Sequence, residues 1–234
     1  MTSSIAPRLV AVVPAAGIGK RMGAAIPKQY LPLCGRTVIE HAIQPLCDHP
    51  EIEQVVISIS EDDRYWNTLP ISAHPKIHLV AGGKERCHSV LNALQYLINI
   101  TPDALVLVHD AARPCLSPVD LNRLIEVGIQ GVNGALLGAR VKDTMKRVTD
   151  GNMVSSTVDR TNLWCAQTPQ MFPVAKLTRA VASAIDEQKL VTDEASAMEL
   201  LGCYPVMVEG SDRNIKVTQP EDLELAAYYL ERMG

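Results

Sequence analysis

Four short runs of aliphatic, mostly β-branched residues constrain the fold of this chain more than any other feature. They lie at residues 9–15, 54–60, 77–83 and 104–111. Each run is continuously apolar, which is typical of strands buried on both faces of a sheet. Segments with helical spacing of apolar residues separate them, at 37–49, 87–98 and 117–130. This alternation predicts an α/β fold with a mainly parallel sheet covered by helices on both faces.

The chain shows no repeat, low-complexity tract or linker that would divide it. Its 234 residues are enough to bury a good core. In the helical segment at 117–130, Ser117 is a plausible N-cap and Pro118 suits the first helical position. Another helix is expected at 222–233, entered through Pro220. We therefore predict a single Rossmann-like domain over residues 1–234.

One segment, at about residues 141–160, departs from this alternation of strands and helices. It contains Asp150-Gly151, a pair typical of hairpin turns, flanked by alternating polar and apolar residues. Few of its apolar residues can face the domain, and a lone two-stranded hairpin is marginal in water. We therefore predict an inserted β-arm that rests on a second subunit. A solvated surface hairpin is the alternative.

The overall composition excludes several classes of partner. The net charge of −4 gives no reason to expect nucleic acid or an anionic membrane surface as a partner. No run approaches the roughly 18 apolar residues of a membrane span, and the first residues do not resemble a secretory signal. The six cysteines form no C-x-x-C pair, which favours free thiols over disulfides or a metal-thiolate site. We expect a cytoplasmic protein that supplies no metal ligand for its reaction.

The glycine-rich segment after the first strand suggests a phosphate cradle. Gly17 and Gly19 fit neither the dinucleotide fingerprint nor the P-loop, because Gly23 comes one position late and Arg21 stands where Ser or Thr is needed. The small-residue turn that remains lets backbone amides approach an anion closely. Three cations follow it, and although each could be an ordinary surface charge, together they favour polyphosphate binding: Lys20, Arg21 and Lys28.

Two further segments follow predicted strands at the same edge of the sheet. Asp110 ends one strand, where a carboxylate can meet a hydroxyl or a phosphate-bound metal; a helix N-cap is the alternative. His109 beside it can be a satisfied buried imidazole and receives no role. In the other segment, Gly82 and Gly83 would leave room for a flat base whose edge Ser89 could contact. Such ligand sites lie beyond the carboxyl ends of parallel strands.

The second half of the chain adds polar residues but no recognisable nucleophile. Local spacing shows no Ser-His-Asp or Cys-His arrangement. Glu194 and Glu199 are expected on a helix, with solvated carboxylates. The candidate functional side chains are mainly cations. This fits phosphoryl or nucleotidyl transfer, in which the protein positions charged groups. The residues noted are Arg160, Thr168, Thr192, Asp193 and Lys216.

Nine segments in order resemble the 2-C-methyl-D-erythritol 4-phosphate cytidylyltransferase family of the nucleotidyltransferase superfamily. They are PAAGIGKRM, PKQY, GGKERCHSV, HDAARP, VKDTMKRV, TVDR, LWCAQTPQ, TDEASA and NIKVTQPEDL. Ribitol-5-phosphate cytidylyltransferases usually show LAGGTGTRM, HDSVRP and TDAC at three of these places. The resemblance implies transfer of CMP from CTP to methylerythritol phosphate in the non-mevalonate isoprenoid pathway, with release of pyrophosphate.

The resemblance also implies roles for individual residues. Arg21 and Lys28 match the pair that stabilises charge at the α-phosphate, and Arg160 and Lys216 match the pair that positions methylerythritol phosphate. The implied CTP-binding residues are Pro14, Ala15, Ala16, Gly17, Gly82, Gly83, Ser89, Asp110 and Ala111. The implied substrate-binding residues are Asp110, Arg113, Thr144, Arg160, Thr168, Thr192 and Lys216.

The same resemblance implies a cofactor and a partner subunit. It implies Mg²⁺ carried mainly by the CTP phosphates, and a homodimer in which Thr144 and Arg160 on the arm serve the neighbouring subunit. Two alternatives stay open. One is a cytidylyltransferase for another sugar or polyol phosphate, such as ribitol 5-phosphate. The other is a nucleotide-binding regulator without activity.

Overall fold

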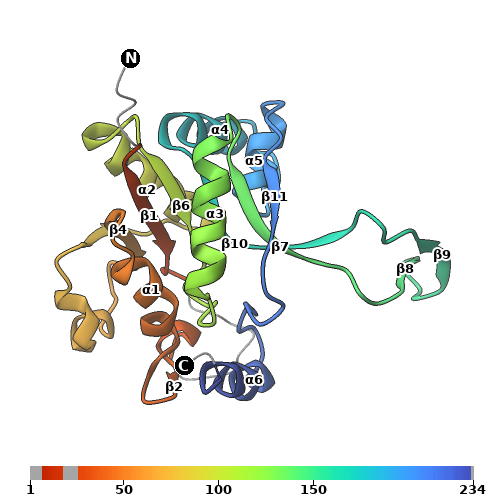
Figure 1. Cartoon of the computed structure of the whole chain (residues 1–234), viewed down its shortest axis with the longest axis horizontal. Coiled ribbons are helices and arrows are strands. Elements are labelled where there is room, and N and C mark those ends of the chain that lie inside the picture. Colours follow the sequence, from red (N-terminus) through yellow and green to blue (C-terminus); the bar gives the residue numbers. More distant parts are fainter. Residues whose placement is uncertain (1–6, 18–25, 233–234) are drawn as a thin grey trace.

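A computed structural model describes residues 7–17 and 26–232 of the chain. Seven strands form one sheet in the order β11-β7-β10-β6-β1-β4-β5 (Figure 1). Their bounds are β1 Leu9–Pro14, β4 Ile52–Ile59, β5 Ile77–Ala81, β6 Leu105–Val108, β7 Ala135–Arg140, β10 Trp164–Pro173 and β11 Val206–Glu209. All neighbouring pairs are parallel except those of β10, which runs antiparallel to β6 and β7. The predicted mainly parallel sheet is confirmed.

Six helices accompany this sheet in the described part of the chain. They are α1 Val38–Asp48, α2 Arg86–Ile100, α3 Pro118–Gln130, α4 Val174–Asp186, α5 Glu194–Leu200 and α6 Pro220–Leu230. The predicted N-cap is present, since Ser117 Oγ accepts a hydrogen bond from the amide of Asp120 at the start of α3. Within these residues, no helix combines the length and apolar character needed to cross a membrane.

Successive residues of β1 face opposite layers, as the geometry of a strand requires. Leu9, Ala11 and Val13 pack in a core with residues of α1 and α3. Val10 and Val12 pack in a second core with residues of α2, α4 and α5. The central strands are therefore buried on both faces, which explains why their sequences are continuously apolar.

Within the described ranges, a short hairpin and three 3₁₀ turns lie between the main strands and helices. A small hairpin pairs β2 Pro32–Leu33 with β3 Arg36–Thr37, and 3₁₀ turns cover Lys28–Tyr30, Trp66–Thr68 and Pro70–Ala73. A third core consists of Leu33, Val38, Cys115, Val217 and Ala226. It packs α6 against β2 and the start of α1. Val217 is fully buried and its amide donates to the carbonyl of Ala112, which fixes the backbone next to Lys216.

A two-stranded arm extends away from the sheet (Figure 1). It pairs β8 Met145–Val148 with antiparallel β9 Val154–Val158. The predicted turn lies between these strands, although the residue with positive φ is Asn152, at 59°, rather than Gly151. The hairpin prediction is correct, and residues 142–157 are all exposed in the single chain.

Candidate functional site

A pocket of about 430 Å³ opens where the loops after β1, β5 and β6 meet. The carboxyl ends of these parallel strands share one edge of the sheet, as the strand order requires. It is lined by Pro14, Ala15, Ala16, Gly17, Lys28, Gln29, Gly83, Lys84, Glu85, Arg86, Ser89, Asp110, Ala111, Ala112 and Lys216. The predicted CTP-binding residues all line it except Gly82, which packs against Ala16 of the lining.

Ala15, which directly follows β1, is held by hydrogen bonds to two neighbouring segments. The amide of Ala15 donates to the carbonyl of Ser58, and Gln29 Nε2 donates to the carbonyl of Ala15 at 2.7 Å. Lys28 Nζ donates to the carbonyl of Val217 at 3.0 Å, so its ammonium lies where the 3₁₀ turn meets the segment before α6. The predicted roles of Lys20 and Arg21 concern residues outside the described ranges.

The two glycines after β5 allow close packing of the pocket wall. A Cβ on Gly82 would lie 2.2 Å from Cβ of Ala16, and one on Gly83 would lie 2.3 Å from Cβ of His88. Any larger residue would therefore push the segment after β5 away from Ala16 and from α2. The predicted reason for these glycines, room for a flat base, is incomplete, because neighbouring protein atoms already occupy the space beside them.

Asp110 is the centre of charge in the pocket. Arg86 Nε lies 2.9 Å from its Oδ1, Lys216 Nζ lies 2.7 Å from its Oδ2, and Arg113 Nε lies 3.8 Å from Oδ2. Burial alone would raise the pKa of Asp110, but the nearby charges of Arg86 and Lys216 hold it well below its usual range. The carboxylate is therefore ionised, and it orients the surrounding cations.

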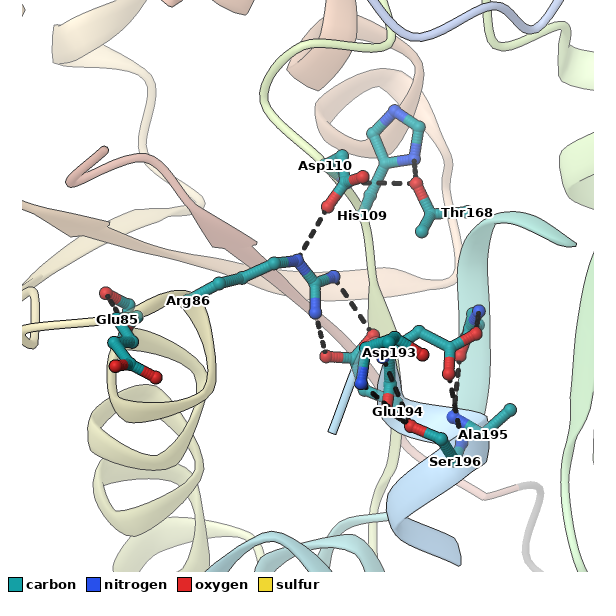
Figure 2. Close-up of polar contacts among 12 residues, drawn as sticks. Glu85, Arg86, His109, Asp110, Thr168, Asp193, Glu194, Ala195 and Ser196 are labelled. Atoms are coloured by element: carbon teal, nitrogen blue, oxygen red, sulfur yellow. Dashed lines mark hydrogen bonds and ion pairs between the residues drawn. The ribbon is translucent and has the colours of Figure 1, made fainter. Parts of the chain in front are cut away.

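Arg86 connects this centre to α5 (Figure 2). Its two terminal nitrogens donate to the Glu194 carboxylate at 2.7 and 3.1 Å, while Nε faces Asp110. Burial would lower the pKa of Arg86, but the two carboxylates raise it, so the guanidinium stays charged. The predicted solvation of Glu194 is wrong, since its side chain is only 3% exposed. Glu199 is exposed, as expected.

Gln170 on β10 explains how Glu194 reaches Arg86. Its Nε2 donates to Asp193 at 2.8 Å and its Oε1 accepts from the amide of Ala195 at 2.8 Å. Asp193 in turn caps α5 by accepting from the amide of Ser196. The start of α5 is thus docked on the sheet, and Thr192 just before it remains exposed outside the pocket lining.

His109 and Thr168 form a buried layer beneath Asp110. Thr168 Oγ1 accepts from the amide of Asp110 at 3.0 Å and lies 3.1 Å from Nδ1 of His109. The other ring nitrogen lies 3.1 Å from the carbonyl of Arg113. Burial lowers the pKa of His109 to about 4, so the imidazole is neutral near pH 7. His109 is the satisfied buried imidazole that the sequence suggested.

A second hollow of about 460 Å³ lies at the base of the arm. Lys216, the partner of Asp110, lines this hollow as well as the first pocket. Arg113 borders it, and its Nη1 donates to the carbonyl of Asn214 at 2.6 Å. Thr144 and Arg160 lie in the exposed arm and line neither hollow. The guanidinium of Arg160 donates to the carbonyl of Lys142. The chain brings together Lys28, Asp110 and Lys216, but not Thr144 or Arg160.

The pocket is suited to a polyanion. Its side chains include four cations, Lys28, Lys84, Arg86 and Lys216, and its hydroxyl, Ser89, already donates to the carbonyl of Glu85 and accepts from the amide of Gly83. Positioned cations of this kind stabilise charge in phosphoryl chemistry. Sequence reasoning missed Arg86 and Glu194, because only folding brings residues so distant in sequence together.

Comparison with known proteins gives consistent results. A family model described as IspD, 2-C-methyl-D-erythritol 4-phosphate cytidylyltransferase, matches residues 9–232. The curated protein of that name from Vibrio parahaemolyticus serotype O3:K6 is 52% identical over 223 residues, which cover 95% of both chains. The one from Aeromonas hydrophila is 51% identical over 99% of this chain and 93% of its own. The solved Francisella tularensis enzyme of the same name superposes with a TM-score of 0.82 at 37% identity, covering 95% of this chain and 99% of that one.

Proposed function

Because the chain belongs to the 2-C-methyl-D-erythritol 4-phosphate cytidylyltransferase family, we propose a mechanism in which its pocket aligns CTP with a phosphate nucleophile. The protein is a nucleotidyltransferase of isoprenoid biosynthesis. It transfers a cytidylyl group from CTP to 2-C-methyl-D-erythritol 4-phosphate. The products are 4-diphosphocytidyl-2-C-methyl-D-erythritol and pyrophosphate. The observation that carries the mechanism is the convergence of Lys28, Arg86 and Lys216 on one pocket.

The reaction is a direct attack of a substrate phosphate oxygen on the α-phosphorus of CTP. That oxygen forms the new P–O bond, the bond to the β-phosphate breaks, and pyrophosphate leaves with the electron pair. Both reactants are anions, so their repulsion opposes the encounter until cations offset it. No nucleophile from the protein is required, which agrees with the engagement of Ser89 by backbone groups.

CTP would lie along the loops after β1, β5 and β6. The small residues of the first loop would admit the triphosphate to the backbone, with Pro14, Ala15, Ala16 and Gly17 as the contacts. Gly82, Gly83 and Ser89 would shape the cytosine pocket, and Asp110 and Ala111 would lie by the ribose. Lys28, together with Arg21, would meet the charge that grows on the α-phosphoryl oxygens and the leaving group.

The second substrate would enter from the side of Lys216. This ammonium is oriented by Asp110 at 2.7 Å and borders both hollows, so it can contact an anion in either. Arg113 and Thr192 would complete that end, and Thr168 would support Asp110 from beneath. Arg160 and Thr144 would come from the arm of a second subunit. The arm supports this role, because it projects from its own domain and carries four exposed apolar side chains, at Met145, Val148, Met153 and Val154.

We assign Mg²⁺ to the nucleotide rather than to a protein cage. Asp110, the buried carboxylate of the described pocket lining, is already engaged by two close cations, so this pocket fits a metal that phosphate oxygens would hold. When bound, Mg²⁺ would neutralise part of the triphosphate charge. We also infer a reducing, cytoplasmic location, which the six free thiols support.

Pyrophosphate release tests the proposal and separates it from the two alternatives. The purified chain would be assayed with CTP and Mg²⁺, and with either methylerythritol phosphate or ribitol 5-phosphate. Fast release with methylerythritol phosphate alone is expected. Preference for ribitol phosphate would support the other cytidylyltransferase. CTP binding without release from any phosphate would support the non-catalytic regulator.

A further inference from the structure

The N-cap and first turn of α2 present three different metal-binding side chains. Among the described residues, Glu85, Cys87 and His88 form a group whose ligand atoms all lie within 4.8 Å of one another. Cysteine spacing gives no hint of it, since only one of the three is a cysteine. None of the three is assigned to the transfer reaction.

The distances fit a small tetrahedral ion. Sγ of Cys87 lies 3.7 Å from Nδ1 of His88 and 4.0 Å from Oε2 of Glu85. Zinc–sulfur and zinc–nitrogen bonds at tetrahedral angles would place their two ligand atoms about 3.6 Å apart. The Cys87–His88 pair already has this separation, and the exposed Glu85 side chain needs only a small rotation to match it.

The charges and ligand types favour one class of metal. A thiolate, a carboxylate and a neutral imidazole together carry two negative charges, which balance the charge of a divalent cation. Sulfur and imidazole ligands select Zn²⁺ over Mg²⁺, which prefers oxygen. Three protein ligands leave a fourth position open to water.

The site would lie at the rim of the nucleotide pocket. Glu85 lines that pocket, and its carbonyl accepts from both the amide and the hydroxyl of Ser89. The backbone of His88 packs directly against Gly83. We propose that Glu85, Cys87 and His88 form a Zn²⁺ site that is separate from the Mg²⁺ carried by CTP.

Metal binding to the untagged full-length chain tests this proposal. Co²⁺, a spectroscopic substitute for Zn²⁺, would be titrated with Mg²⁺ in excess, and Zn²⁺ affinity would then be measured by competition with a chromophoric chelator. We expect one equivalent of Co²⁺ with a thiolate-to-cobalt charge-transfer band, displaced by Zn²⁺. Binding should weaken at lower pH, because the ligands must lose protons.

Single substitutions identify the ligands. Cys87→Ser should abolish the charge-transfer band, and Cys87→Ser or His88→Asn should lower Zn²⁺ affinity by about 100-fold or more, since changes behind the ligands already cost 10- to 100-fold. Glu85→Gln should also weaken binding. Cys203→Ser is the matched control, because Cys203 is another partly buried cysteine. Its Zn²⁺ affinity should equal that of the unmodified chain.

Alkylation of cysteines in the unmodified chain tests the site without relying on the folding of any variant. Bound Zn²⁺ should slow alkylation of Cys87, followed by peptide mass spectrometry, while alkylation of Cys203 should not change. The proposal is overturned if Co²⁺ gives no thiolate band, if Cys87→Ser retains it, or if Zn²⁺ leaves alkylation of Cys87 unchanged.

Discussion

Arg86 donates two hydrogen bonds to Glu194, a residue 108 positions further along the chain, at 2.7 and 3.1 Å. The same guanidinium reaches Asp110 through Nε at 2.9 Å. One side chain on the first turn of α2 therefore joins the loop after β6 to the start of α5. In this way it fixes one wall of the nucleotide pocket.

Glu194→Gln should destabilise the protein and weaken CTP use. The substitution leaves Arg86 with Asp110 as its remaining carboxylate partner, so the cost should lie below the roughly 3–5 kcal/mol of a buried charge left unpaired. We expect a matching decrease in the free energy of unfolding in urea, with a higher KM for CTP. Glu199→Gln, on the exposed face of the same helix, should change neither quantity. Equal behaviour of the two variants would contradict the pairing.

Lys28→Ala should lower kcat while the fold is kept. Loss of one preorganised charge donor typically costs roughly 3–4 kcal/mol of barrier, about a hundredfold to a thousandfold in rate. Steady-state pyrophosphate release measures kcat, and circular dichroism checks the fold. Lys189→Ala removes an exposed cation paired with Glu187, and serves as the control with unchanged turnover. Near-normal kcat in Lys28→Ala would remove Lys28 from the reaction.

Arg160→Ala should impair use of methylerythritol phosphate more than binding of CTP. The arm is expected to meet the second substrate, so KM for that substrate should rise while CTP affinity, measured by calorimetry, is largely kept. A loss confined to CTP binding would argue against this role.

Subunit mixing tests whether the arm serves a neighbouring subunit. Lys28→Ala and Arg160→Ala chains are each impaired, but a mixed dimer would have one site with both residues intact. Random exchange of equal amounts should then restore about a quarter of normal activity, since half of the dimers are mixed and one of their two sites is complete. Absence of recovery after exchange, verified by native mass spectrometry, would indicate that the arm serves its own subunit or none.

His109 should make the protein lose stability as the pH falls from about 6.5 to 4. Burial lowers the folded-state pKa of His109 from 6.5 to about 4. Between these pH values the imidazole is protonated in the unfolded chain and neutral in the folded chain. The free energy of unfolding should fall by roughly 3 kcal/mol across the window through this residue. Urea unfolding at a series of pH values measures it.

Replacement of His109 should reduce that pH dependence. His109→Gln keeps hydrogen-bonding capacity toward Thr168 and the Arg113 carbonyl, but cannot titrate. Its unfolding free energy should therefore vary less between pH 6.5 and 4 than that of the unmodified chain. His78→Gln, at a partly buried histidine on β5, should keep the steeper dependence. An unchanged slope in His109→Gln would refute the assignment.

The amino-acid sequence by itself determined the strands β1, β4, β5 and β6, the helices between them and the hairpin of the arm. These elements depend on local patterns: continuous apolar runs, helical spacing, a Ser-Pro helix start and a turn pair. It also determined most of the pocket lining, because the order of parallel strands places Ala15, Gly83 and Asp110 at one edge. Lys28 stood out as a cation after the glycine-rich segment and Lys216 as a polar residue of the second half, and the family resemblance gave both a role at the site.

The tertiary structure alone decided the electrostatic state of the site. Glu194 looks like an ordinary helical surface carboxylate in the sequence, yet Gln170 docks α5 so that Glu194 is buried against Arg86. Asp110 likewise became the partner of Arg86 and Lys216. The physical reason is that an ion pair depends on distance and burial, and both are set by packing between segments far apart in the chain.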